Sequence, residues 1–185
     1  MYQNRNNIDY EIVLLLLKGK NHLRSISKQL DEAPTTISRR LSALLNENVI
    51  DFQIEGKNKA FFLRKNLQAK NYVFNAERHK LMKLLKKYPE LDVIIEDILK
   101  KCDEKLIVLF GSYAKETAKK GSDIDIYVDT KKRNVKERIE CVHSNISVKI
   151  GAFDKDAALI KEIIKNHVIL KGTEEFYEKT RFFES

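Results

Sequence analysis

Apolar residues recur every three or four positions in the first third of the chain. This period predicts amphipathic helices at residues 9–18 and 23–30, and a third helix that begins at Pro34. Asp9 is the expected N-cap of the first helix, and Gly19 is expected to end it. Three short helices therefore account for the apolar residues in this part of the chain.

The pattern then changes to the character of extended strands. Segments 49–54 and 59–64 are predicted to pair as a β-hairpin, because a turn with the sequence Glu-Gly-Lys-Asn separates them. The lysines at and beside this turn give the hairpin a basic tip. Three helices followed by a hairpin indicate a first domain at residues 1–66.

Residues 67–185 combine helical periods with short apolar runs, which predicts an α+β domain built on a small sheet. Apolar runs predict strands at 106–110 and 124–128, and a third strand is expected at 145–153. Pro89 separates two helical segments that precede the first of these strands. Further helices are predicted at 134–141, 156–166 and 174–183.

A polar segment joins the first two of these strands and carries the candidate chemistry. It begins with Gly111 and Ser112, and ten residues separate Ser112 from Asp123. Asp123 and Asp125 share one face of a strand because alternate side chains point the same way. Two such carboxylates, about 7 Å apart, suit Mg²⁺ or Mn²⁺ held jointly with the phosphates of a substrate. Gly111 allows a tight turn, and free N–H groups at Ser112 favour a polyphosphate.

This segment resembles the minimal nucleotidyltransferases, a prokaryotic branch of the superfamily that includes DNA polymerase β. The matching residues are Gly111, Ser112, Tyr113, Ala114, Lys115, Ser122, Asp123, Ile124 and Asp125. The resemblance implies an α/β domain with a small mixed sheet at residues 67–185. It implies that Asp123 and Asp125 are catalytic and bind the metal, and that a nucleoside triphosphate is bound by Gly111, Ser112, Lys115 and Ser122.

The chain departs from this family in two places. Glu116 stands where the family usually has glycine. Active members also carry a third carboxylate on a later strand, whereas segment 145–153 contains no Asp or Glu. Glu140 and Asp154 flank that segment and are expected to cap it or to lie in loops. Transfer of a nucleoside monophosphate to a hydroxyl therefore stays open, and the alternative is an inactive fold used for dimerisation or as an antitoxin-like module that binds a protein.

Residues 1–66 resemble the winged helix-turn-helix domains of prokaryotic transcription regulators. The resemblance rests on three helices followed by a hairpin and on the sequence Thr-Thr-Ile-Ser-Arg-Arg-Leu. In these domains the third helix enters the major groove of DNA and the hairpin touches the backbone. The resemblance implies contacts with double-stranded DNA by Thr35, Thr36, Arg39, Arg40, Lys57 and Lys59. Winged helices also serve as protein–protein modules, so that alternative stays open.

The composition supports these expectations without deciding between them. The 185 residues carry a net charge of +8, which favours polyanionic partners. The two cysteines show no zinc-ligand spacing, and no apolar run is long enough to cross a bilayer. We therefore expect a cytoplasmic protein with no membrane partner. It is predicted to be a homodimeric transcription regulator whose second domain binds a nucleoside triphosphate and acts on a hydroxyl acceptor, a protein among the candidates.

Overall fold

The computed structural model describes residues 3–184 and contains two compact units. The first unit runs to His79 and takes in the chain end from Phe183. The second unit covers Lys80–Phe182. Each unit combines helices with a small β-sheet, so the predicted α+β class is confirmed.

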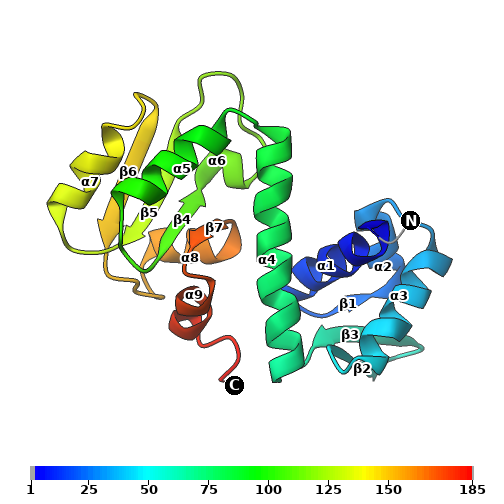
Figure 1. The fold of residues 1–185 in the computed structure, drawn as a ribbon. Coiled ribbons are helices and arrows are strands. Elements are labelled where there is room, and N and C mark those ends of the chain that lie inside the picture. Colours follow the sequence, from blue (N-terminus) through cyan, green and yellow to red (C-terminus); the bar gives the residue numbers. More distant parts are fainter. Residues whose placement is uncertain (1–2, 185) are drawn as a thin grey trace. The chain divides into compact units, whose positions relative to one another are not determined.

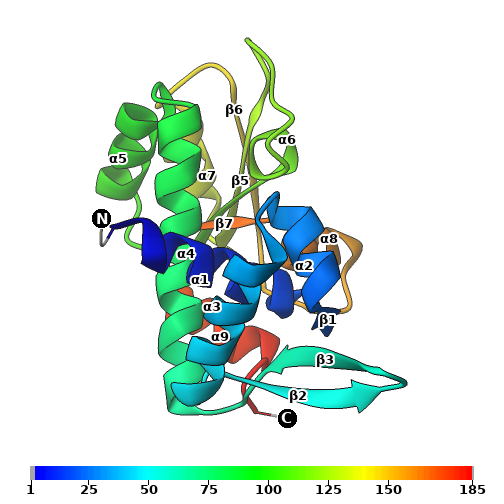
Figure 2. The same cartoon turned by 90° about the vertical axis from the view of Figure 1, so that its right-hand side faces the viewer.

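The first unit contains three helices and a three-stranded sheet, followed by the start of a longer helix (Figure 1). Its elements are α1 (Gln3–Leu17), β1 (Asn21–His22), α2 (Leu23–Leu30), α3 (Pro34–Asn46), β2 (Ile50–Glu55) and β3 (Asn58–Leu63). The antiparallel pair of β2 and β3 is the predicted hairpin, and it extends away from the helices of this unit (Figure 2). β1 was not predicted, because a strand of two residues carries no periodic signal.

Asp9 does not cap α1. The helix begins at Gln3, so Asp9 lies in its interior with a side chain that is only 4% exposed. Its Oδ1 accepts a hydrogen bond of 2.6 Å from Nε of Arg40, and Nη2 of Arg40 binds the other oxygen. The predicted N-cap is therefore wrong. The apolar run after Asp9 indicated a helix start, whereas a partner on α3 decides where this carboxylate lies.

The long helix α4 (Leu67–Lys87) begins directly after residues 1–66, which were predicted to form the first domain. Its sequence begins as a polar stretch, but Ala69, Val73 and Ala76 are fully buried at helical spacing. These three residues hold the start of α4 on the first unit, and the division between the units falls inside the helix, after His79. The first part of this helix was not predicted, because its exposed positions are polar, whereas the helical segment before Pro89 was predicted.

The second unit is a four-stranded mixed sheet with helices. After the last turns of α4, its elements are α5 (Leu91–Lys101), β4 (Ile107–Phe110), α6 (Gly111–Ala114), β5 (Ile124–Asp129), α7 (Arg133–Glu140), β6 (Ile146–Gly151), α8 (Ala158–Lys165), β7 (Val168–Lys171) and α9 (Thr173–Thr180). The strand order is β6-β5-β4-β7, in which only β5 and β6 are parallel. The predicted small mixed sheet is confirmed, while β7 was not predicted.

One face of this sheet is covered by α5 and α7 (Figure 1). Alternate residues of the strands point into the resulting core, among them Ile124, Ile126 and Val148. The opposite face carries the residues between them, so Tyr127 and Asp125 point away from α5 and α7. Rings of Tyr127, Phe153 and Phe176 pack edge to face there, and this aromatic cluster covers part of the second face.

Candidate active site

Gly111 and Asp125 lie against each other where β4 ends and β5 begins. Phe110 and Asp125 are paired in the antiparallel register, which brings the next residue, Gly111, beside the carboxylate. Gly111 has φ +70°, a backbone conformation that favours glycine. A Cβ at this position would lie 2.9 Å from Cγ of Asp125 and closer still to its Oδ2. The missing side chain of Gly111 therefore makes the space that the carboxylate of Asp125 occupies.

The two carboxylates of the Asp-Ile-Asp motif differ in their surroundings. Asp125 is half-buried within β5, and Asp123 is exposed just before the strand. Ile124 lies between them with its side chain in the core, and its N–H donates to the carbonyl of Asn145 at 2.8 Å. This anchoring fixes the start of β5. Asp125 lies on the face opposite the core, and Asp123 lies directly before the strand, near enough for its charge to act on Asp125.

The environment of Asp125 favours a cation. Burial raises the pKa of Asp125 above its ordinary value of 3.8, and the negative charge of Asp123 raises it further. Positive charge on Lys149 and Lys115 lowers the pKa, but the net direction is upward. A carboxylate that is costly to ionise gains from a divalent cation placed beside it, because the cation stabilises the charged form.

The metal ligands of the chain would be these two carboxylates. No cluster of three or more His, Cys, Asp or Glu side chains suited to a metal occurs within residues 3–184. Mg²⁺ in sites that act on phosphates is commonly held by one or two carboxylates, with phosphate oxygens and water completing the shell. The pair Asp123 and Asp125 fits a metal that is bound together with a nucleotide.

The predicted phosphate-binding residues follow directly after Gly111. Ser112 lies in the first turn of α6, where backbone N–H groups precede any intrahelical acceptor. Lys115 is exposed just after α6, and its Nζ lies 2.5 Å from Oε1 of Glu162. Ser122 has a different position, since its Oγ accepts the N–H of Lys119 at 2.9 Å and shapes the loop. In the structure, Lys115 therefore forms an ion pair with a glutamate, and the Ser122 hydroxyl is hydrogen-bonded within its own loop.

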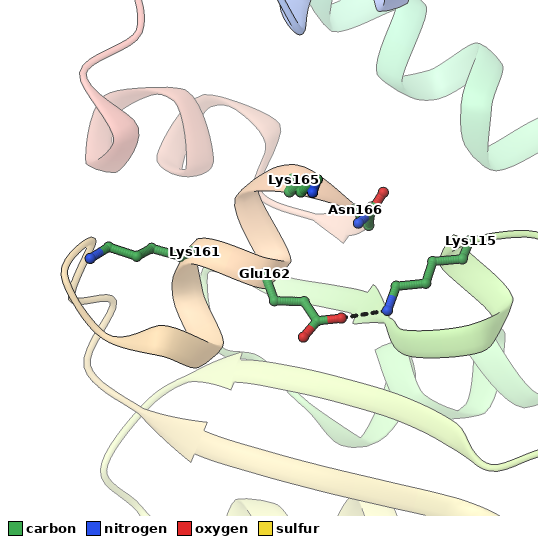
Figure 3. Close-up of a pocket in the computed structure, with 5 residues that line it drawn as sticks. All are labelled: Lys115, Lys161, Glu162, Lys165 and Asn166. Atoms are coloured by element: carbon green, nitrogen blue, oxygen red, sulfur yellow. Dashed lines mark hydrogen bonds and ion pairs between the residues drawn. The ribbon is translucent and has the colours of Figure 1, made fainter.

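A pocket of about 510 Å³ lies beside Lys115, and α8 forms its other side (Figure 3). Its lining residues are Lys115, Lys161, Glu162, Lys165 and Asn166. The sequence analysis missed the three charged residues on α8 and Asn166, which follows the helix. They lie about fifty positions from the Gly-Ser segment, and charged side chains on a helix look like an ordinary solvated surface.

Glu116 occupies the position at which the resemblance predicts glycine. Its φ is +58°, so this turn does adopt the left-handed conformation that glycine favours. The carboxylate of Glu116 pairs with Nζ of Lys87 at 3.1 Å, and the same Nζ donates to the carbonyl of Glu116 at 3.0 Å. The loop therefore keeps its backbone shape without the glycine, and Lys87 contacts it from α4.

The strand expected to carry a third carboxylate has none beside Asp125. In the parallel pair of β5 and β6, Asp125 is in register with Ser147. Glu140 accepts the N–H of Val148 at 3.2 Å, and Asp154 accepts the N–H of Asp156 at 3.0 Å. Both flanking acids hold backbone groups, as the sequence analysis expected.

Residues 91–181 match the family model described as the nucleotidyltransferase domain. The second unit carries a nucleotidyltransferase-like domain. No curated protein matches the chain. A solved chain from the crystal structure of a toxin-antitoxin with AMP-PNP is similar, with 23% identity and a TM-score of 0.33 over 58% of this chain and 81% of that chain. A TM-score at this level supports no argument about this chain. Within residues 3–184, no helix has the length and apolar character needed to cross a membrane.

The residues predicted to contact DNA lie in the first unit, outside the nucleotidyltransferase-like domain. Thr35, Arg39, Lys57 and Lys59 are exposed, and Thr36 is half-buried. Arg40 differs from them, because its side chain is 16% exposed and its guanidinium binds the buried Asp9. The geometry gives Arg40 a structural role in joining α3 to α1.

Replacing Asp125 by Asn is expected to stabilise the nucleotidyltransferase-like domain. A raised pKa means that folded Asp125 holds its proton more tightly than unfolded Asp125, so its ionised form costs stability at neutral pH. The melting temperature of Asp125→Asn should exceed that of the parent by roughly 2 °C or more at pH 7. The difference should shrink as the pH falls toward the ordinary value of 3.8, where the parent is also protonated. Asp103→Asn, at an exposed position, is the control and should change little.

Proposed function

We propose that the nucleotidyltransferase-like domain binds a nucleoside triphosphate with Mg²⁺ or Mn²⁺ and transfers its nucleoside monophosphate to a hydroxyl. The observation that carries this proposal is the packing of the Asp125 carboxylate into the space left by Gly111. That packing holds one carboxylate beside a second, Asp123, next to a turn that leads to Lys115. Two carboxylates beside a turn suited to phosphate support the metal-assisted transfer of a nucleotidyl group.

In this proposal the residues of the domain mainly position the nucleotide and stabilise the charge on its phosphates. Asp123 and Asp125 bind the metal, which supplies charge neutralisation at the phosphates when it is bound. Backbone N–H groups at Ser112 hold the terminal phosphates, and Lys115 moves from Glu162 to a phosphate oxygen. The α-phosphate is thereby held for in-line attack by the hydroxyl, an orienting effect that contributes a large share of such rate enhancements.

Transfer of α-labelled nucleotide tests this proposal. With Mg²⁺ present, label from a nucleoside triphosphate should pass to a hydroxyl-bearing oligonucleotide, a peptide or the protein itself. Asp123→Asn should lower the rate at least about 100-fold, because only one of the two metal ligands remains. Glu137→Gln, at an exposed position on α7, is the matched control and should transfer at the parental rate. Transfer by Asp123→Asn at the parental rate would contradict the assignment.

We further propose that the first unit is a winged helix-turn-helix domain that binds double-stranded DNA as part of a transcription regulator. Three helices followed by an antiparallel hairpin support this proposal, as do the exposed Thr35 and Arg39 on α3 and the exposed Lys57 and Lys59 on the hairpin. Thr36 belongs to the same proposed surface. Arg40 does not, because its guanidinium is engaged by Asp9. Such domains bind palindromic DNA as dimers, so a homodimer is part of the proposal.

Arg39→Ala is expected to weaken duplex binding and to reduce its dependence on salt. Loss of one phosphate contact lowers the slope of log K against log salt by about 1, whereas loss of a base contact costs about 1–3 kcal/mol. Fluorescence anisotropy with a labelled duplex at several salt concentrations measures both effects. Arg78→Ala removes the same charge from an exposed position on α4 and should leave both nearly unchanged. Equal affinities and slopes for Arg39→Ala and the parent would contradict the proposed surface.

A second function is favoured by one observation on β6. Ser147 stands beside Asp125 where a third carboxylate would be expected. A domain without that acid would bind a nucleotide or a protein partner without transferring anything, as an antitoxin-like or dimerisation module. Nucleotide binding without label transfer to any hydroxyl would support this second function over the first.

A further inference from the structure

Glu162 is the acidic residue that α8 brings to the phosphate-binding residues of the proposed site. Its side chain points from the helix toward Lys115 across the pocket, and the two charged groups are joined at 2.5 Å (Figure 3). The side chains of Lys115 and Glu162 are 41% and 49% exposed, so solvent and ligands can reach both. Lys161 and Lys165, on either side of Glu162 along α8, line the same pocket.

Glu162 and Asp125 belong to one electrostatic cluster. The negative charge of Glu162 raises the pKa of Asp125, and the positive charge of Lys115 lowers it. These effects fall off with distance, so α8 brings its carboxylate close enough to act on Asp125. The pocket beside Lys115 is thus lined by the carboxylate of Glu162, whose charge also acts on Asp125.

We propose that Glu162 supplies the third carboxylate that β6 lacks and accepts the proton of the attacking hydroxyl. This inference rests on the proposed function of the domain. The acceptor oxygen forms a bond to the α-phosphorus, and the bond between the α-phosphorus and the bridging oxygen to the β-phosphorus breaks. Pyrophosphate leaves with the bonding electrons, and the hydroxyl proton passes to Oε of Glu162 and then to water. The nucleoside monophosphate stays on the acceptor.

The contact between Lys115 and Glu162 also links nucleotide binding to this role. Without nucleotide, the hydrogen bond from Lys115 lowers the pKa of Glu162, and Lys165 lowers it further, which makes the carboxylate a weak base. A triphosphate competes for Lys115 with a larger negative charge. Once Lys115 turns to the phosphates, Glu162 loses the hydrogen bond that made it a weaker base. Its carboxylate can then accept the proton of the acceptor hydroxyl.

Glu162→Gln separates the two consequences of this arrangement. Removing the competing carboxylate frees Lys115 for the phosphates. The affinity for ATP with Mg²⁺, measured by calorimetry, should therefore rise at least about threefold. Removing the proton acceptor should slow pyrophosphate release at least about 100-fold. The release is measured with γ-labelled ATP and two acceptors, an oligonucleotide with a free 3′-hydroxyl and a tyrosine-bearing peptide. Glu162→Asp keeps a carboxylate and should recover part of the rate.

The outcomes distinguish this inference from the proposed function. Glu137→Gln makes the same charge change on α7 and should match the parent in both measurements. Unchanged pyrophosphate release by Glu162→Gln, or weaker binding together with slower release, would overturn the role of Glu162 while leaving the nucleotide site in place. A parent that binds ATP but releases no pyrophosphate with either acceptor would overturn it as well. Failure of the parent to bind any nucleotide would instead overturn the proposed function.

Discussion

Gly111→Ala is expected to abolish most nucleotide binding while leaving the protein folded. Its Cβ would overlap the carboxyl group of Asp125, so this proposed metal ligand must move away from its position. The alanine must also adopt φ +70°, which L-residues disfavour. Together, backbone strain and overpacking should lower the free energy of unfolding by about 2–4 kcal/mol. The affinity for nucleotide with Mg²⁺ should fall at least about tenfold, because a loss of about 1.4 kcal/mol of binding free energy at the displaced carboxylate is sufficient for that change.

Gly121→Ala provides the control for the backbone effect. Gly121 has φ +83° in the loop before β5, and a Cβ there would meet no atom of the described residues within 4 Å. Its substitution should cost only about 1 kcal/mol of stability and should leave nucleotide binding near the parental value. Calorimetric binding and denaturant unfolding of the two variants measure the difference. Equal nucleotide affinities for Gly111→Ala and Gly121→Ala would contradict the role given to the close approach at Gly111.

Arg40→Met is expected to destabilise the first unit more than any exposed substitution on α3. Burial raises the pKa of Asp9, although the charge of Arg40 opposes this, so the carboxylate depends on its partner to stay ionised. Removing the guanidinium leaves a buried carboxyl group without its charged partner. Breaking such a pair from one side costs about 3–5 kcal/mol. Denaturant unfolding followed by circular dichroism should therefore show a lower midpoint for this variant.

Two further variants identify the cause of that loss. Arg39→Met removes the neighbouring charge from an exposed position and should change stability by less than about 0.5 kcal/mol. The double variant Asp9→Leu/Arg40→Met removes both charges and should recover most of the stability, because apolar replacement of a buried pair is often close to neutral. A single Arg40→Met variant as stable as Arg39→Met would show that the ion pair is not what joins α3 to α1.

Much of the fold could be predicted because its signals are local. The helical stripe of α3, the turn of the β2–β3 hairpin and the alternation around Ile124 each lie within one short segment. The start of α4 was missed because its exposed positions are polar and its buried ones are small. The strand β1 was missed because two residues are too few to show a period. Asp9 was misassigned because a capping position and a buried ion pair look alike without knowledge of α3.

The candidate site likewise contains residues that the sequence indicated and residues that only the tertiary fold reveals. Gly111, Asp123 and Asp125 lie close in sequence on two paired strands, so spacing alone indicated them. Glu162 lies on a helix that returns to the site only through the tertiary fold, and a glutamate among lysines carries no local signal. Arg40 looked like its neighbour Arg39 in the sequence, and only the packing of α3 on α1 separates a buried guanidinium from an exposed one.

The most direct test of the nucleotide site is calorimetric titration of ATP, GTP, CTP and UTP in Mg²⁺. The parent should bind at least one of them with micromolar affinity, and the binding should require the metal. The double variant Asp123→Asn/Asp125→Asn should lose that binding although it remains folded and gains thermal stability. Retention of the parental affinity in the double variant, or no binding of any nucleotide by the parent, would contradict the assignment of these carboxylates to a metal–nucleotide site.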